Sequence, residues 1–347
     1  MLVESPPERR AQTAPALPTR RAAKAFGLFL SLAVLVLVAL ASIAIGAKAL
    51  SPDQVWHGLF HGTGTYGDVV VDERLARTVL GLLAGAALGL SGAVLQALTR
   101  NPLADPGLLG INAGASAAVV TAITWFGVTS LSGYVWFAFG GAAAVGALVW
   151  FLGGGRGATP VRLALAGTAI SAALYGYLQA VMITDDAALG RMRFWTVGSL
   201  TSATDSTIAQ VLPFFAVGTV LALALARPLN AVAMGDDTAR ALGANLGRTR
   251  VLAMLAATVL CGAATAACGP IVFVGLMVPH VVRSLTGPDL RWILPYATVL
   301  SPVLLLGADV VGRVVVRPSE LQVGIVTAII GGPVFIFLVR RRRTAQL

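Results

Sequence analysis

The sequence predicts an all-α integral membrane protein with about ten transmembrane helices. Hydrophobic residues occupy 57% of its 347 positions and charged residues only 12%, a balance that excludes a water-soluble domain. The apolar residues form continuous runs and do not alternate with polar ones, which favours helices over a membrane β-barrel. A helix needs about 20 apolar residues to cross a hydrocarbon core of about 30 Å, so the chain has room for ten crossings joined by short loops.

Ten apolar runs predict these helices in order. They cover residues 25–47, 75–98, 107–127, 133–152, 162–183, 206–226, 248–268, 270–283, 291–312 and 321–339. We interpret residues 25–340 as one transmembrane domain. Residues 1–24 are rich in proline, alanine and arginine and predict a disordered cytoplasmic tail. The first run is longer than the apolar part of a signal peptide, so we expect an uncleaved membrane anchor.

The basic residues predict the orientation, because short loops rich in Lys and Arg stay in the cytoplasm. With both termini in the cytoplasm, the inner loops and tails hold 18 of the 25 Lys and Arg residues. The opposite orientation would invert this bias, and an odd number of crossings would break it. The net charge of +10 is spread over the ends of the runs and the two tails, which is not the dense basic patch of a nucleic-acid-binding protein.

Three runs carry small or helix-breaking residues at informative positions. In the second run, Gly81, Gly85 and Gly89 recur every four residues and predict a smooth face for close helix packing. Pro106 directly precedes the third run, and the eighth run is short and begins at Pro270. Interrupted spans at matching places of two halves often line a transport path, although simple helix kinks would give the same pattern.

The chain holds no recognisable energy source of its own. A nucleotide-binding loop needs a Gly-rich turn followed by Lys and then Ser or Thr, and the two lysines, Lys24 and Lys48, lie in no such turn. An ion-coupled carrier needs carboxylates near the middle of the membrane, whereas the acidic residues here fall in loops or near the ends of the runs. Energy is therefore expected from a partner that contacts an inner loop, and an ion-coupled secondary transporter is the alternative.

The longest inner loop, residues 228–247, is the best candidate for that contact. Asp236 and Asp237 favour the start of a short helix, and Gly243 ends it. A rigid helix of this kind can dock in a groove of another subunit. An ordinary connecting loop fits the same residues equally well.

Long strings of residues follow one another along the chain from about residue 70 to 340. They are Arg74-Leu-Ala-Arg77, Gln96 to Gly110, Arg162 to Gly167, Phe194 to Leu200, the 235–245 loop, Gly269 to His280, Glu320 to Gly324, and Gly332 to Ile336. In this order they resemble the FecCD family, the permease subunits of type II ABC importers for ferric siderophores, haem and cobalamin. The resemblance implies the BtuC-like fold of ten helices, a place in the bacterial cytoplasmic membrane, and a second permease subunit, identical or related, around a central path.

The resemblance also implies roles for residues at three places. ATPase subunits, which hold ATP and Mg²⁺, would dock on the inner loop at Gly235, Asp236, Asp237, Arg240, Gly243 and Asn245. A binding protein outside the membrane would dock near Arg74, Arg77 and Arg313, because guanidinium groups suit carboxylates. The alternative is that these arginines pair with Glu73 or Asp309. A cytoplasmic gate would lie at Asn101, Pro102, Leu103, Asp105 and Pro106, together with Pro160 and Val161.

The cysteines and histidines predict no chemistry. Cys261 and Cys268 lie seven residues apart in one apolar run and are interpreted as small apolar residues. His57, His61 and His280 have no metal-ligand spacing. We therefore expect no catalytic residue, no metal site and no cofactor in this chain. The predicted cargo is a ferric siderophore, the commonest substrate of the resembled family, with cobalamin or haem as alternatives, and a non-transport membrane scaffold is disfavoured.

Overall fold

The computed structural model describes residues 18–61, 64–155 and 159–343. Within these ranges the chain is helical and has no β-strand, which confirms the all-α prediction. Each predicted apolar run coincides with a helix: α1 (Pro18–Ala44), α3 (Tyr66–Thr99), α4 (Ile111–Phe126), α5 (Leu131–Leu152), α6 (Pro160–Thr184), α8 (Asp205–Ala224), α11 (Leu246–Cys268), α12 (Val274–Thr286), α13 (Leu290–Val315) and α14 (Val323–Arg343). Short helices connect them: α2 (Pro52–Phe60), the 3-10 helix η1 (Pro106–Leu109), α7 (Asp186–Trp195), α9 (Ala226–Ala233) and α10 (Asp236–Ala241).

Seven helices in the described part of the chain are long and apolar enough to cross a membrane. They are α1, α3, α5, α6, α8, α11 and α13. α4 and residues 323–337 of α14 are shorter apolar helices, and α12 has 13 residues. The protein is therefore a multi-pass membrane protein. That all ten helices cross, with both termini in the cytoplasm, stays a prediction.

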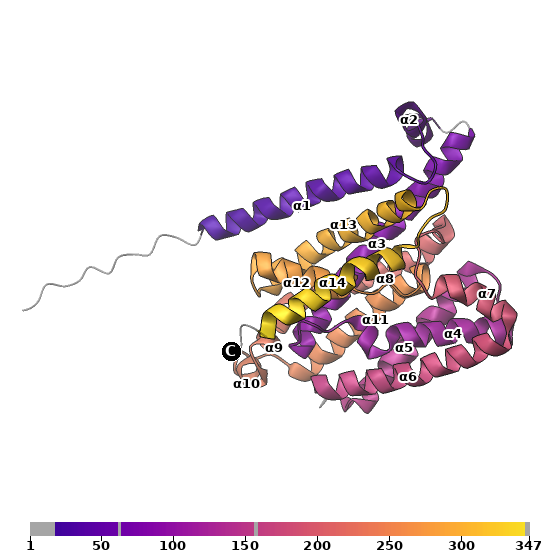
Figure 1. The fold of residues 1–347 in the computed structure, drawn as a ribbon. Helices are drawn as coiled ribbons and strands as arrows, with labels where there is room; N and C mark the ends of the chain where they lie inside the picture. The colour runs from indigo at the N-terminus through magenta and orange to yellow at the C-terminus, as the bar shows by residue number, and fades with distance from the viewer. Residues whose placement is uncertain (1–17, 62–63, 156–158, 344–347) are drawn as a thin grey trace, which may run out of the picture.

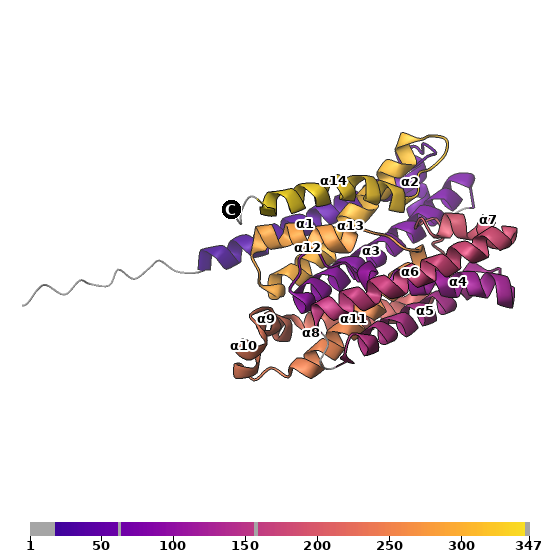
Figure 2. The same ribbon diagram turned by 60° about the horizontal axis from the view of Figure 1, so that its bottom comes forward.

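The long helices form an elongated bundle around α3 (Figures 1 and 2). α3 packs on α13, α11 and α12, and it is buried along most of its length. α2 and α7 lie at one end of the bundle, whereas α9 and α10 lie at the other, together with the start of α1 and the end of α14 (Figure 1). We call these the outer end and the inner end, after the predicted orientation.

α3 meets α13 along the predicted face of small residues. A Cβ atom on Gly81, Gly85 or Gly89 would collide with residues 301–306 of α13, and at Gly85 the obstacle is the backbone of Pro302. Small residues at such an interface let two helices approach closely and gain van der Waals contact, which is the main source of helix association in a bilayer. The predicted smooth face is therefore confirmed, with α13 as its partner.

The third and eighth predicted spans are both interrupted where they begin. Before α4 the chain forms η1, and Gly110 then turns it with a φ of 75°. Before α12, Phe273 has a φ of 70°, a left-handed conformation that is uncommon for a residue with a side chain. α4 and α12 are consequently only 16 and 13 residues long. The Gly and Pro positions correctly predicted that both spans are interrupted, although only the eighth was predicted to be short.

Three of the strings that carry the family resemblance meet at the outer end. Ser199 N donates at 2.7 Å to the carbonyl oxygen of Cys268, the residue just before the string that begins at Gly269, and Gly324 N donates to Gly198 O at 3.1 Å. Gly324 also lies so close to the carbonyl oxygen of Val197 that a Cβ atom would not fit. The loop after α7 is thereby fixed between the end of α11 and the start of α14.

Two helix starts differ from the predicted boundaries. α3 begins at Tyr66, ahead of the predicted run, because the Thr65 hydroxyl accepts from Asp68 N and the Asp68 carboxylate accepts from Thr65 N, which is a capping box. The polar residues in this first part hide it from a hydropathy pattern. α1 begins at Pro18, so residues 18–24 are helical where the sequence predicted a disordered tail. Residues 1–17 of that predicted tail lie outside the described residues.

Candidate functional site

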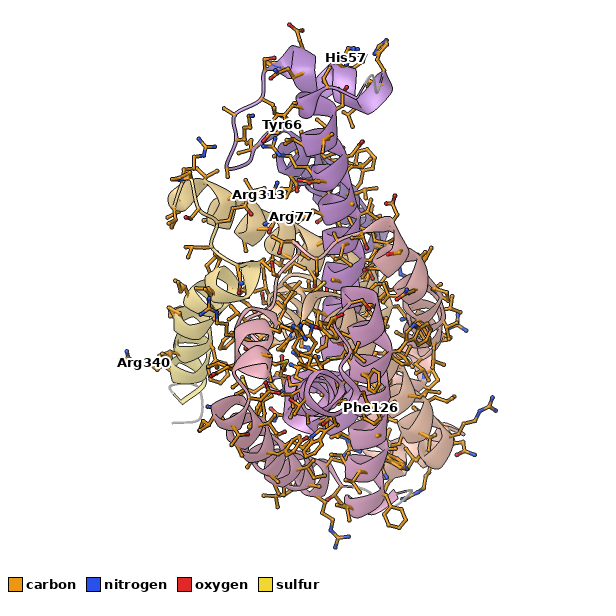
Figure 3. All side chains as sticks on the ribbon, turned by 90° about the vertical axis from the view of Figure 1, so that its right-hand side faces the viewer. His57, Tyr66, Arg77, Phe126, Arg313 and Arg340 are labelled. Carbon is orange, nitrogen blue, oxygen red and sulfur yellow. The ribbon has the colours of Figure 1, made fainter. Side chains whose placement is uncertain are left out.

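Arg77 and Arg313, two of the three arginines predicted for docking, lie side by side at the outer end (Figure 3). Asp309 lies between them and is fully buried. It lies within α13 and not at a helix end, where the sequence suggested it would be. Arg77 Nη2 lies 2.7 Å from Asp309 Oδ1, and Arg313 Nη2 lies 2.7 Å from Oδ2 as an ion pair without hydrogen-bond alignment. Arg77 Nη1 also donates to Glu320 Oε2 at 2.7 Å. One buried carboxylate therefore bridges two guanidinium groups.

Arg74 and Arg313 also bind the C-terminal end of α1. Arg74 Nη1 donates to the carbonyl oxygens of Ile43 and Ala44 at 3.1 and 3.0 Å, and Arg313 Nη1 donates to Ser42 O at 2.7 Å. The last turn of a helix leaves carbonyl oxygens without partners and carries a partial negative charge. The two arginines supply hydrogen-bond donors to these carbonyl oxygens and a positive charge beside the helix end, and they hold α1 against α3 and α13.

The predicted docking arginines are mostly buried. Arg74, Arg77 and Arg313 keep only 6%, 9% and 1% of their surface exposed. They form part of the wall of a cavity of about 540 Å³ at the outer end, which the exposed side chains of Lys48 and Glu73 also line. The alternative pairing with Asp309 is thus present, whereas contacts to Glu320 and to the α1 carbonyls were not predicted. The role in docking stays a prediction.

At the inner end, α10 occupies the loop that was predicted to contact a partner. Gly235 precedes it with a φ of 110° and Gly243 follows it with a φ of 77°, both in the left-handed region that favours glycine. Asp237 and Arg240 are exposed and pair with each other at 2.9 Å. Asn245 lies beyond the short helix, and its side chain caps the first turn of α11. The residues predicted for coupling therefore form one exposed turn of helix and its two flanking turns.

Asp236 points inward, unlike its neighbour Asp237. Its Oδ1 pairs with Arg100 Nη2, at the end of α3, and its Oδ2 accepts from Arg250 Nη2 of α11 at 2.7 Å. Arg100 Nε donates in addition to Val232 O of α9 at 2.9 Å. These contacts tie α10 to the residue that directly precedes the predicted gate loop.

The two predicted gate segments lie together at the inner end. Asn101, Asp105 and Val161 line one cavity of about 350 Å³. Two side chains shape the loop, because Asn101 Oδ1 accepts from Leu103 N at 3.0 Å and Asp105 Oδ1 accepts from Gly107 N at 2.8 Å. Asx turns of this kind fix a loop without regular structure. The fold thus brings together two segments that are well separated in the sequence.

The remaining gate residues occupy structural positions. Pro102 and Pro106 are buried, and Leu103 is half-buried. Pro106 begins η1, and Pro160 begins α6 although its side chain lies outside the described residues. Their part in gating stays a prediction.

Asp105 of the gate loop should make the stability of the protein depend on pH. Burial raises the pKa of its carboxyl to about 6, against the opposing effect of the Gly107 hydrogen bond. A carboxyl whose pKa is higher in the folded than in the unfolded protein stabilises the fold at low pH, and that stabilisation is lost as pH rises through about 6. Asp105→Asn removes the titration. The melting temperature of the variant minus that of the wild type, measured in detergent, should therefore be larger at pH 7.5 than at about pH 5, and a pH-independent difference would contradict this.

The structure offers no metal centre among its described residues, since no group of three His, Cys, Asp or Glu side chains could hold an ion there. Cys261 and Cys268 are buried and free. His57 lies in α2, where its Nδ1 is 3.2 Å from Asp68 Oδ1 and its ring stacks on that of His61.

Comparisons with known proteins agree with the all-α membrane fold. A profile of the FecCD transport family matches residues 34–341. The ferric enterobactin transport system permease protein FepD of Escherichia coli (strain K12) is 48% identical over 315 residues, which are 90% of this chain and 94% of that protein. The hemin transport system permease protein HmuU of Yersinia pestis is 37% identical over 318 residues, with coverages of 90% and 94%. A solved inward-facing conformation of a metal-chelate type ABC transporter has a TM-score of 0.79 and 29% identity, and it covers 92% of this chain and 99% of that chain.

Proposed function

Because the chain belongs to the FecCD transport family and is a transport permease, we propose that it is the membrane subunit of an ATP-driven importer whose cargo is a ferric siderophore. The observation that carries this proposal is the 48% identity to a ferric enterobactin permease over nearly the whole of both chains. Identity to the hemin permease is lower, at 37%. Haem, and after it cobalamin, are therefore the second candidates for the cargo.

The topology that fits this function has ten crossings of the bacterial cytoplasmic membrane and both termini in the cytoplasm. The start of α1 and the end of α14 lie at the same end of the bundle (Figure 1), as an even number of crossings requires. α4, α12 and α14 complete the number, if η1 and residues 269–273 continue the paths of α4 and α12. Non-helical backbone is tolerated at membrane depth where protein surrounds it.

Energy in this proposal comes from ATPase subunits that hold ATP and Mg²⁺ and dock on α10. The Asp237 side chain is fully exposed and that of Arg240 is 63% exposed, and Leu242 beside them is 64% exposed. α10 thus offers charge and apolar surface together, which suits a groove on a partner.

A second permease subunit, identical or related, would pack against α6 and α14. Both helices lie on the side of the bundle that faces the viewer in Figure 1. Leu165 and Ile183 of α6, and Ile336 of α14, are 66%, 82% and 58% exposed. A binding protein would cover the outer end, above the cavity that Arg74 and Arg313 line.

An ion-coupled secondary transporter is the alternative from another class. Its signature would be a carboxylate inside the bundle that is free to take up a proton or a cation. Asp309 is buried there, but both of its oxygens face arginines. This pairing supports the ATP-driven proposal.

Uptake by proteoliposomes tests the proposed function. With the ATPase and binding protein present, uptake of a ferric siderophore should require internal MgATP, stop with vanadate, and continue when ionophores collapse proton and sodium gradients. Uptake that ignores ATP and stops with an ionophore would favour the alternative. Parallel assays with haem and cobalamin identify the cargo, and transport of either one without the siderophore would overturn that part of the proposal.

A further inference from the structure

The carboxylate of Asp236 joins the ends of three helices at the inner end. It is the first residue of α10, and its two oxygens contact Arg100 at the end of α3 and Arg250 near the start of α11. We propose that Asp236 is a positioning residue that transmits the position of α10 through Arg100 to the loop Asn101–Pro106. The inference rests on the proposed ATP-driven function and names the side chain that links its two inner elements.

The geometry at Arg100 makes this link short. Arg100 is the C-cap of α3, with a left-handed φ of 51°, and the gate loop begins at the next residue. Its guanidinium pairs with Asp236 and also donates to Val232 O at the end of α9. A displacement of α10 therefore pulls directly on the residue from which the gate loop starts.

The segment that holds Asp236 has a small core of its own. Val232, Ala239 and Leu246 pack together as a buried cluster separate from the main core. Because these residues come from α9, α10 and the start of α11, the three segments are suited to move as one body. Besides the packing of α9 and α11 on α3, Arg100 links this body to the end of α3 through its contacts with Val232 O and Asp236, which makes the Asp236 contact a point of transmission.

The two arginines that contact Asp236 require its negative charge. Two arginines contact one aspartate, so removing it would leave Arg100 and Arg250 facing each other without a counter-ion. The side chains of Asp236, Arg250 and Arg100 are 32%, 16% and 39% exposed. Such partly buried, charge-assisted contacts are stronger and less screened than a pair on an open surface.

The adjacent acid provides a matched control. Asp237 lies in the same turn of α10 and has the same charge, but its side chain is fully exposed and pairs with Arg240 of its own helix. Removing the Asp237 charge therefore alters the exposed face of α10 without touching Arg100. The two variants separate docking on α10 from transmission beyond it.

The test uses the complete transporter in proteoliposomes, with three measurements on Asp236→Asn and Asp237→Asn. These are the amount of ATPase subunit that co-purifies with the permease, the rate of ATP hydrolysis, and the uptake of ferric siderophore per ATP hydrolysed. For Asp236→Asn we expect normal co-purification, hydrolysis near the wild-type rate, and uptake per ATP reduced about tenfold, the effect of losing one charge-assisted hydrogen bond. Asp237→Asn alters the docking face, so it should lower co-purification of the ATPase subunit, while the complexes that do form should transport as much siderophore per ATP as the wild type.

Further variants guard against simple misfolding. Asp236→Glu keeps the charge and should restore most of the coupling. Arg100→Gln should reproduce the Asp236→Asn defect, and the double variant should be no worse than either single one, because both break the same contact. Full coupling in Asp236→Asn, additive defects in the double variant, or an equal loss in Asp237→Asn would each overturn the inference. A wild-type complex without ATP-dependent uptake would instead refute the proposed function.

Discussion

Replacing Gly92 by alanine is expected to prevent stable packing of α12 on α3. A Cβ atom at position 92 would overlap the carbonyl of Gly275, and a Cβ atom at position 275 would itself lie only 2.7 Å from Leu88 O. The two helices cannot simply separate, because Gln96 Nε2 donates to the carbonyl oxygens of Gly275 and Leu276 at 3.3 and 3.0 Å. Overpacking a core costs about 1–3 kcal/mol, and here the obstacle is backbone, so the loss should reach or exceed the upper value. Size-exclusion profiles and melting temperatures in detergent measure it.

Gly140→Ala is the matched control for this change. Gly140 lies within α5, and a Cβ atom there would have no neighbour within 4 Å. The substitution adds the same methyl group to a membrane helix without meeting another element. It should therefore leave the profile and the melting temperature as in the wild type. If Gly92→Ala behaves like Gly140→Ala, the close approach of α3 and α12 is not required for folding.

The fold was predictable where hydropathy carries the signal. The ten helices that follow the apolar runs are long or apolar, and α10 was predicted from the acids at its start and the glycine after it. α7 was missed, since its ten residues mix polar and apolar side chains; its capping acid, Asp185, accepts from the backbone N–H groups of Ala187 and Ala188. A single aspartate before a mixed segment is too weak a signal in a sequence dominated by apolar runs.

The candidate sites were predictable as positions but not as contacts. Arg77 and Arg100 lie at opposite ends of the bundle, as the sequence predicted. However, Arg77 binds Glu320, which is 243 positions away, and Arg100 binds Asp236, which is 136 positions away. Composition and periodicity describe local structure only, so they cannot show which distant charges meet. The sequence also treated Asp309 as a residue near a helix end, because its burial depends on packing against α3, which brings Arg77 to it.

Replacing Asp309 by alanine is expected to destabilise the outer end strongly. The change leaves Arg313, which is 1% exposed, without any carboxylate, and it leaves Arg77 with Glu320 alone. Breaking a buried ion pair by removing one partner costs about 3–5 kcal/mol, because the remaining charge stays buried without compensation. Asp72→Ala is the control, since Asp72 is exposed near the outer end. Thermal unfolding in detergent should show a large loss for Asp309→Ala and almost none for Asp72→Ala.

The ion pairs of Asp309 with Arg77 and Arg313 limit how docking at the outer end can be tested. A glutamate at position 77 or 313 would face Asp309 inside the bundle, so a loss of docking could follow from misfolding alone. A double-mutant cycle resolves this, because Arg313→Met removes the cation that Asp309→Ala would strand. The cost of Asp309→Ala should therefore be markedly smaller in the Arg313→Met background. If the two costs simply add, the arginines are not held by Asp309, and charge reversals at these positions would then report on docking directly.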